Sequence, residues 1–278
     1  MRIEFDGFNV KITTSKHVVF NRENNSVICM DLNAKEKVIN TVARDLKLFI
    51  NSSMDIVETF SNCDDLSYSM TIDEYCEVNN TIIVKDNNRN INKHIDVLGD
   101  VSLNEILVDL GESSSKVSMN IDLNGEHINC YNRVACMASS IVKNYDIRVN
   151  HNTSNSSSKL DNYGVATLNG ELHFKATGSI GKECSKSSML QNNKIILFDD
   201  ESKGDIEPLL LIDNNDVNAS HAAAVGKVDD NQIFYLCSRG ISESNAKKMI
   251  ALGYLTPVLE YIKDVKVKDD LSNIIAKI

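Results

Sequence analysis

The sequence contains no tryptophan, two prolines and 12 glycines among its 278 residues. Such low proline and glycine contents exclude collagen-like and proline-rich chains. No apolar run approaches the roughly 18 residues that a membrane-spanning helix requires, so we predict no membrane span. The first six residues, MRIEFD, also lack the basic and then apolar pattern of a signal peptide, and we therefore expect a cytoplasmic protein.

Positive charge is scarce as well, since 29 lysines and arginines stand against 39 aspartates and glutamates. The net charge of -10 argues against a nucleic-acid-binding surface, which needs a basic footprint. The phosphate-binding pattern GxxxxGK followed by Ser or Thr is absent, so this chain is not expected to bind ATP by itself. Hydrophobic residues nevertheless make up 42% of the chain, which is enough to build a core.

Cysteine is present but is not arranged for a recognisable metal motif. The seven cysteines are scattered, and no two of them form a CxxC pair. We therefore predict neither a zinc knuckle nor a ferredoxin-type cluster motif. In a reducing compartment disulfides are not expected either, and most of these cysteines should be buried as small hydrophobic residues.

Asparagine is abundant throughout the chain, and short apolar segments alternate with polar turns. Between about Val18 and Gly226 these segments recur every ~8–16 residues, which is typical of stacked rungs, a sandwich or a barrel. Aromatic residues reach only 6%, and just two dipeptides, Asn124-Gly125 and Asn169-Gly170, are good hairpin turns. Many short strands with asparagine at the corners favour a β-helix, in which each coil contacts its neighbours.

One segment of this region is compatible with two structures. A helical spacing is shared by four apolar residues, namely Val38, Val42, Leu46 and Phe49. From Leu46 to Ile50, however, apolar and polar residues alternate as they do in a strand. The sequence leaves a short helix and a strand equally open here.

After Gly226 the pattern changes to helical segments with capping residues. The predicted caps and stops are, in order, Asp229 or Asp230, Gly240, Ser242, Gly253 and Pro257, and a last segment carries Leu271, Ile274 and Ile275 on one face. Pro257 is expected to open a third helical segment, separate from the one that Ser242 caps. We therefore predict an all-β core over residues 1–226, with irregular N-terminal rungs, and a C-terminal α-helical region over 227–278.

The stretch from Val149 to Leu259 resembles the SufB/SufD family of iron–sulfur cluster assembly scaffolds. The most specific part is a Ser-His-x-Ala-x-Val-Gly run at 220–226, followed by Phe-Tyr-Leu-x-Ser-Arg-Gly-Ile-Ser at 234–242. Further matches in family order are Asn150-His151, the small residues at 154–158, Gly178-Ser179-Ile180, and the segments at 191–197 and 207–212. The chain resembles a short form of the family and is more similar to SufD than to SufB.

This resemblance implies a right-handed parallel β-helix (β-solenoid) whose C-terminal helical region docks on SufC, an ABC-type ATPase. It further implies that two β-helix subunits pair and carry a transient iron–sulfur cluster between them. The expected function is therefore that of a non-catalytic scaffold subunit with two partners, a SufC-like ATPase and a second SufB/SufD-type subunit. The sequence leaves a homodimer and a heterodimer both open.

Individual site residues follow from the same resemblance. His221 matches the family histidine implicated in cluster assembly, and a neutral imidazole can ligate iron. Asn192 stands where SufB carries its essential cysteine, and Ala219 stands where a SufD-type cysteine is found; an amide cannot replace a thiolate as a soft ligand. Cys184 is the nearest alternative ligand, with a buried core cysteine as the competing interpretation.

The resemblance also places Tyr235, Arg239 and Gly240 in the segment that is expected to face the ATPase. An arginine at the end of a helix can equally be a solvated contact to the helix dipole. Cys237, in the same segment, is expected to serve packing.

Two alternative functions remain at this point. One is a family-derived interaction module that keeps the ATPase contact but has no cluster role, which the residues Asn192 and Ala219 favour. The other is a β-helix carbohydrate enzyme, which predicts pairs of carboxylates on one face of a sheet and usually a secreted chain.

Overall fold

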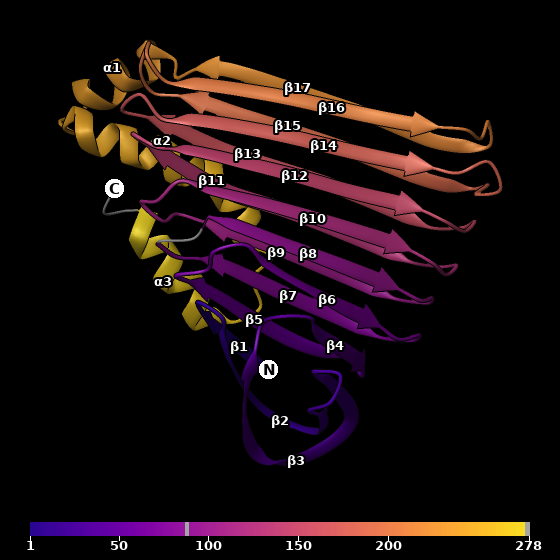
Figure 1. Ribbon diagram of the computed structural model, residues 1–278. Coiled ribbons are helices and arrows are strands. Elements are labelled where there is room, and N and C mark those ends of the chain that lie inside the picture. The colour runs from indigo at the N-terminus through magenta and orange to yellow at the C-terminus, as the bar shows by residue number, and fades with distance from the viewer. Residues whose placement is uncertain (87–88, 276–278) are drawn as a thin grey trace.

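The computed structural model describes residues 1–86 and 89–275, apart from the side chains of 31–33. The described residues form a long β-solenoid with three helices at its C-terminal end (Figure 1). One parallel sheet of the solenoid contains the even-numbered strands β4 (Leu46–Asn51), β6 (Leu66–Ile72), β8 (Asn90–Val97), β10 (Ser115–Leu123), β12 (Val142–His151), β14 (Glu171–Ile180) and β16 (Lys203–Ile212). The other contains β5 (Met54–Ser61), β7 (Glu77–Val84), β9 (Ser102–Asp109), β11 (Asn129–Ser139), β13 (Ser157–Thr167), β15 (Ser187–Leu197) and β17 (Val217–Lys227). The predicted β-helix is therefore confirmed.

Strands within each sheet pair in parallel with the strand one coil earlier and the strand one coil later. Leu46 of β4 lies beside Tyr68 of β6, whereas Ile180 of β14 lies beside Ile212 of β16, so a coil takes more of the chain near the C-terminal end than near the start. Because the register is parallel and unbroken, residues one coil apart point to the same face. Apolar side chains consequently form columns that fill the solenoid interior.

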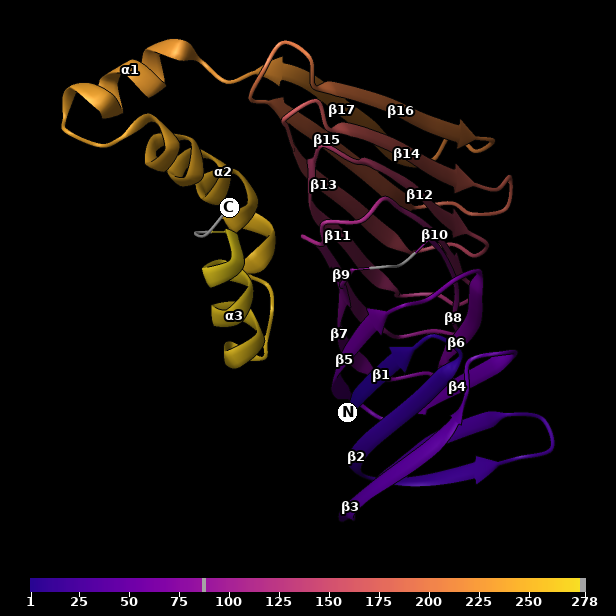
Figure 2. The same ribbon diagram turned by 60° about the vertical axis from the view of Figure 1, so that its left-hand side comes forward.

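The N-terminal end of the solenoid is closed by antiparallel strands. Strand β1 (Arg2–Asp6) pairs in parallel with β5 and antiparallel with β2 (Asn9–Asn21), and β2 forms a long antiparallel hairpin with β3 (Ser26–Val42). This hairpin lies across the end of the stack (Figure 2) and buries apolar side chains such as Ile12 and Val27. It thereby shields the first coil from water. The sequence pattern did not distinguish this antiparallel cap from the parallel coils.

The segment that was compatible with either helix or strand forms strands. Val42 ends β3, and Leu46, Leu48 and Ile50 are buried on β4 while the residues between them are more exposed. The alternation of buried and exposed positions therefore decided the structure over the helical spacing. A strand at this point also supplies the partner that β6 requires.

The two dipeptides that suggested hairpins are instead corners between consecutive strands of the solenoid. Asn124-Gly125 follows β10, which pairs in parallel with β8 and β12. A Cβ on Gly125 would lie 1.7 Å from the carbonyl oxygen of Leu98, so the corner packs directly on the corner one coil below. Glycine is required here by that close approach and not by a hairpin turn.

Asparagine residues stabilise these corners in two ways. Several of them, including Asn62, Asn155 and Asn169, have positive φ angles of 55°, 57° and 64°, which asparagine tolerates better than most residues. Others stack from coil to coil: the amide of Asn152 donates to Asn124 at 2.8 Å, and that of Asn124 donates to Asp96 at 3.0 Å. The proposed use of asparagine as corner chemistry is confirmed.

Three helices follow the last strand: α1 (Asp230–Ser238), α2 (Glu243–Leu259) and α3 (Val265–Ile275). Asp229 and Ser242 are the N-caps of α1 and α2, as predicted, and Gly240 follows α1 with φ of 87°. No helix of the described residues is long and apolar enough to cross a membrane.

The prediction that Gly253 ends the second helix and that Pro257 opens a third was wrong, because α2 runs through both residues. Proline at 257 removes the hydrogen bond to the carbonyl of Gly253. Burial of α2 against the outer face of the odd-numbered sheet compensates, through residues such as Leu255 and Val258. Tertiary packing here outweighs local helix propensity.

Charged groups are also buried inside the solenoid, where they form two separate clusters. In the first, the ammonium group of Lys93 lies 3.0 Å from Glu58 and 2.7 Å from Glu105, and Tyr68 donates to Glu58 at 2.6 Å. Burial raises the pKa of Glu105, and the charge of Lys93 only partly offsets this effect. Burial alone would lower the pKa of Lys93, but the charges of Glu105 and Glu58 hold it above its usual value.

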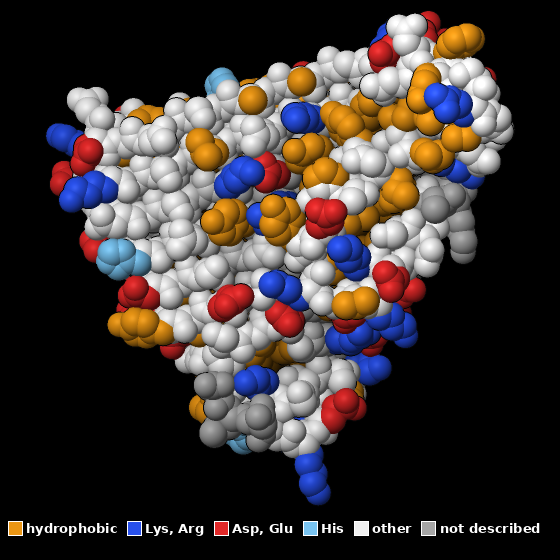
Figure 3. Space-filling model, turned by 180° about the vertical axis from the view of Figure 1, so that it is seen from behind, with side chains coloured by type: hydrophobic (Ala, Val, Ile, Leu, Met, Phe, Trp, Pro, Cys, Tyr) orange, Lys and Arg blue, Asp and Glu red, His pale blue; other side chains and the backbone are white. Residues whose placement is uncertain are grey.

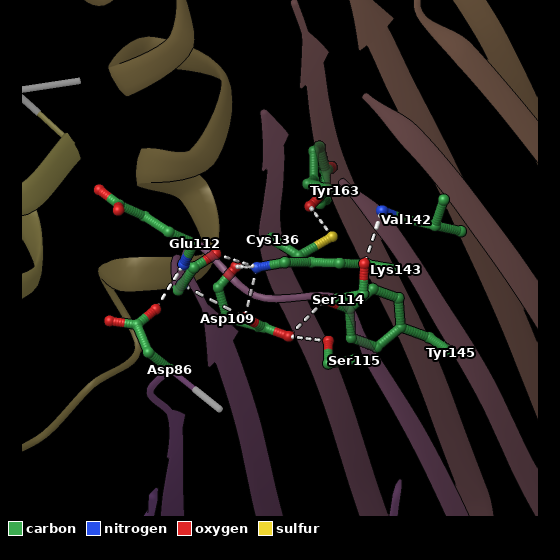
Figure 4. Close-up of polar contacts among 11 residues, drawn as sticks. Asp86, Asp109, Glu112, Ser114, Ser115, Cys136, Val142, Lys143, Tyr145 and Tyr163 are labelled. Atoms are coloured by element: carbon green, nitrogen blue, oxygen red, sulfur yellow. Dashed lines mark hydrogen bonds and ion pairs between the residues drawn. The ribbon is translucent and has the colours of Figure 1, made fainter. Parts of the chain in front are cut away.

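The second cluster lies farther along the solenoid and is drawn in Figure 4. Lys143 donates to a carboxylate oxygen of Asp109 at 2.5 Å and to the carbonyl of Gly111 at 2.7 Å. The other oxygen of Asp109 accepts hydrogen bonds from Ser115 and Tyr145 at 2.6 and 2.8 Å. The ammonium group and the carboxylate are therefore each paired and hydrogen-bonded, as buried charges must be.

We predict that Lys93→Met lowers the free energy of unfolding by about 3–5 kcal/mol, because it leaves Glu58 and Glu105 buried without a cation. Lys116→Met is the matched control, since Lys116 is exposed on the neighbouring strand β10. Urea unfolding followed by circular dichroism measures the difference. Equal stability of the two variants would show that the buried cluster contributes nothing.

Candidate functional site

The last coil of the solenoid, formed by β16 and β17, is the exposed end of the stack (Figure 1). No residue of either strand is buried, whereas the strands one coil below, β14 and β15, are buried at about every second position. Within the described chain, β16 and β17 pair only with these two strands and have none stacked on their outer edges. Their outward-facing backbone N–H and C=O groups are therefore free to pair with another chain.

His221 lies in the middle of β17, beside Gln191 of β15. Gln191 is buried in the solenoid interior, and the parallel register therefore directs His221 into the mouth of the interior at the open end. His221 is exposed, and in the described part of the chain its ring makes no hydrogen bond or ion pair. An imidazole in this position is available to a ligand that approaches the open end.

The floor beneath His221 is polar. Gln191 donates to the carbonyl of Leu209 at 3.1 Å, but its side-chain oxygen has no partner among the described residues. Asn193 is the next residue along β15 whose side chain points into the interior, and it accepts a hydrogen bond from Asn162 at 2.7 Å. Its own amide nitrogen has no partner among the described residues. A buried polar group without a partner is costly, so this end of the interior is better suited to polar ligands than to apolar ones.

Asn192 and Ala219, the two positions at which the resemblance implies cysteines in related proteins, differ in their surroundings. Asn192 points to the outer face of the sheet and donates to Asp161 at 2.9 Å. Ala219 points inward on β17, beside the buried Met189. His221 and Asn192 thus lie on adjacent strands but on opposite faces of the same sheet.

Cys184 is not brought close to His221. It is buried in the corner that precedes β15, and its thiol contacts the carbonyl of His151 at 3.1 Å. Roughly 13 Å of strand separates Ser187 at the start of β15 from Gln191 beneath His221. Cys184 and His221 therefore cannot share one ligand in this arrangement.

The other cysteines are poor ligands as well. Cys29, Cys63, Cys76, Cys130, Cys136 and Cys184 are all buried, as predicted, and Cys237 is half-buried. Burial raises the pKa of Cys29 to about 11 and that of Cys130 to about 12. The thiols of Cys29 and Cys130 therefore stay protonated near neutral pH and lack the thiolate form that binds metal.

Helix α1 carries the residues that the resemblance places at the ATPase. It has no buried residue and lies away from the sheets (Figure 2). Phe234 is 74% exposed and Tyr235 is 56% exposed, and the guanidinium of Arg239 lies 5.1 Å from the ring centre of Tyr235. Figure 3 shows hydrophobic side chains gathered at the upper right of the rear face, where α1 and α2 lie.

Arg133 connects the helical region to the solenoid, and sequence analysis did not identify it. It is buried on the outer face of β11, where it hydrogen-bonds to Asn104. Its guanidinium lies 3.6 Å from the ring centre of Tyr261, just after α2, a distance that favours a cation–π contact. No sequence motif marks such a residue, because Asn104 and Tyr261 are both distant from it in the sequence.

Comparisons with known proteins match most of the length of this chain to one protein family. The model of the family described as "SUF system FeS cluster assembly, SufBD core domain" matches residues 45–254, which run from the start of β4 into α2. The Iron-sulfur cluster assembly protein SufD of Bacillus subtilis is 33% identical over 135 residues, covering 49% of this chain and 31% of that protein.

Two further relatives match shorter or more distant segments. SufD of Escherichia coli is 28% identical over 163 residues, covering 58% of this chain and 38% of that protein. A SufBD family protein of Mycobacterium leprae is 33% identical over 108 residues, covering 39% of this chain and 12% of that protein. The matches thus cover less than two fifths of each of these relatives.

The burial of His151 predicts an acid-sensitive step in stability. Its two ring nitrogens contact Ser156 at 2.6 Å and Ser158 at 2.7 Å, and desolvation lowers its pKa to about 4. Because the unfolded pKa is about 6.5, this neutral histidine stabilises the fold above that pH, and on the order of 3 kcal/mol is lost as the pH falls to 4.

Urea unfolding of the wild type and His151→Gln between pH 7 and pH 4 measures this contribution. We expect the variant to lose less stability on acidification, since it has no imidazole to protonate. Parallel pH profiles of the two proteins would rule out a neutral, buried His151.

Proposed function

Because the chain belongs to the SufBD core-domain family of the SUF iron–sulfur cluster assembly system, we propose that it is a non-catalytic scaffold subunit of such an assembly complex. It pairs with a second β-helix subunit through the open end of the solenoid, and it binds a SufC-like ABC ATPase through its terminal helices. A transient cluster is held between the paired subunits. The observation that carries this proposal is His221, exposed in the mouth of an uncapped solenoid.

The edge of β17 supports the pairing step. From Val217 to Gly226 the strand carries no lysine, arginine, aspartate or glutamate, and small residues occupy most of its length. Natural proteins usually protect a free strand edge with charges, proline or a covering segment. The opposite end of the solenoid has such a cover in the β2–β3 hairpin. The free edge of β17 has none of these protecting features along almost its whole length among the described residues, and it is therefore suited to pairing with a strand of another subunit.

The cluster contribution of this chain rests on an imidazole rather than a thiolate. His221 offers a nitrogen ligand, whereas Asn192 and Ala219 offer no soft ligand and Cys184 is buried elsewhere. Iron in iron–sulfur clusters is held mainly by cysteine thiolates. The thiolates must then come from the paired subunit, so a heterodimer with a cysteine-bearing subunit accounts for these residues better than a homodimer.

The terminal helices are suited to transmit movement from an ATPase to the solenoid. Exposed α1 offers Phe234, Tyr235 and Arg239, while α2 and α3 are packed against the outer face of the odd-numbered sheet. When an ATPase pair closes and displaces α1, the movement therefore reaches α2 and α3, which are attached to the solenoid. Such a rigid-body shift would alter the geometry between the two paired β-helices.

The cluster role is tested by anaerobic reconstitution of the complex with iron and sulfide. We expect His221→Ala to reduce the visible absorbance of the cluster by about half or more, because one ligand is lost. Cluster absorbance should be unchanged in Cys184→Ala, which alters a buried corner, and in His173→Ala, which alters the outer face of a sheet. Full cluster absorbance in His221→Ala would instead support an interaction module without a cluster role.

The ATPase contact is tested by co-purification at low and moderate salt. We expect Tyr235→Ala and Arg239→Ala each to weaken binding by about tenfold, the size of an interface contact worth ~1.4 kcal/mol. Tyr75→Ala is the matched control, because Tyr75 is 76% exposed at a corner far from the helices in sequence. Absence of any association of the wild type with the ATPase at micromolar concentrations would contradict the proposed docking.

A further inference from the structure

A second group of ligand-type side chains lies on the outer face of the even-numbered sheet. His94 and Asp96 are on β8, and Asp122 is on β10, directly beside Asp96 in the parallel register. The Nε2 atom of His94 lies 3.2 Å from Oδ2 of Asp96 and 3.6 Å from Oδ2 of Asp122. One ligand atom from each of the three residues lies within 4.8 Å of the other two.

The spacing of these atoms suits a metal ion at their centre. Zinc and similar ions bind imidazole nitrogen and carboxylate oxygen at about 2.0–2.2 Å, which separates neighbouring ligand atoms by roughly 3.3 Å in a tetrahedral site. The two distances from His94 bracket this value. The ligand atoms of Asp96 and Asp122 lie within 4.8 Å of each other and would approach each other to complete three ligand positions.

Asparagine side chains orient each of the three groups. Asn124 donates to the far oxygen of Asp96 at 3.0 Å, and Asn150 donates to the far oxygen of Asp122 at 2.6 Å. The amide nitrogen of Asn120 lies 3.1 Å from Nδ1 of His94 and also donates to Oδ2 of Asp122 at 3.0 Å. With this amide orientation Nε2 carries the proton toward the carboxylates, and a metal ion bound at Nε2 would replace that proton. Such outer contacts fix the direction of metal ligands and are a regular part of metal sites.

The site is accessible but not fully solvated. The side chain of His94 is 42% exposed, that of Asp96 33% and that of Asp122 21%. His94 and Asn120 also line a hollow of about 430 Å³ on this face. Water or another small ligand can therefore reach an ion bound here and occupy its remaining coordination positions.

We propose that His94, Asp96 and Asp122 form a binding site for one divalent first-row transition-metal ion. One imidazole and two carboxylates suit Zn²⁺, Fe²⁺, Mn²⁺ or Co²⁺, and the absence of sulfur from the ligand set disfavours a cluster or Cu⁺. The three ligands leave at least one position for solvent. This site is separate from the open end at His221 and does not depend on the proposed cluster role.

No HxxxH spacing surrounds His94, so the sequence alone does not mark it as a metal ligand. Asp96 and Asp122 are instead separated in the sequence by the length of one full coil. The outward-facing positions of adjacent coils meet only once the register is known. A His-x-Asp dyad on one strand was the sole local signal.

Titration of the metal-free full-length chain with Co²⁺ tests the proposal, because visible absorption of bound Co²⁺ reports its ligands. We expect one Co²⁺ per chain that Zn²⁺ displaces, without the near-ultraviolet charge-transfer band of a thiolate ligand. His94→Gln and Asp122→Asn should each weaken binding at least ~10-fold, and Asn150→Ala about 10-fold.

His173→Gln is the matched control, since this histidine lies on the same face with a single carboxylate, Glu171, 3.8 Å away. His221→Ala controls for the open end, and both variants should bind Co²⁺ like the wild type. Circular dichroism establishes that each variant is folded. Binding that persists in His94→Gln, or that is lost in His221→Ala, would overturn the assignment, as would a wild type that binds no Co²⁺ or Zn²⁺.

Discussion

The parallel hydrogen-bonded ladder between successive coils is the constraint on which the rest of this structure depends. Each coil forms hydrogen bonds with the backbone groups of its neighbours, so the first and last coils each have one edge that needs another hydrogen-bonding partner or a cover. At the N-terminus the antiparallel hairpin of β2 and β3 provides one. At the C-terminus the chain leaves the sheet after β17 and folds its helices back onto a lateral face, so the end itself stays open.

The same ladder explains how distant residues become neighbours. One coil of the solenoid returns each side chain to the same face, one strand farther along. Inside the solenoid this brings Glu58, Glu105 and Lys93 into one buried cluster. Outside, it stacks Asn124 on Asp96 at the corners and places Asp122 beside Asp96. Structural and functional groups therefore arise from one repeated geometry.

The sequence predicted the features that local pattern controls. Short apolar bursts and asparagine-rich turns predicted a coiled β body, and the capping residues Asp229 and Ser242 predicted where α1 and α2 begin. It failed where tertiary packing decides, as at Pro257, which burial keeps within α2. The orientation of His221 at the open end and the neighbours of His94 required the coil register, which periodicity alone does not supply.

The central claim is that a second β-helix subunit pairs with the free edge of β17. The backbone N–H of Val228 donates to the carbonyl of Leu197, and the carbonyl of Asp216 accepts from the backbone N–H of Lys186. The backbone groups of even-numbered residues in β17 therefore point toward β15. Those of odd-numbered residues, including the N–H of Ala223, point toward the free edge. Ala223→Pro thus removes an edge donor without breaking the ladder. Sedimentation analysis of the complex should show paired scaffold subunits for the wild type and unpaired, folded subunits for Ala223→Pro. Pairing that is unchanged in this variant would contradict the account.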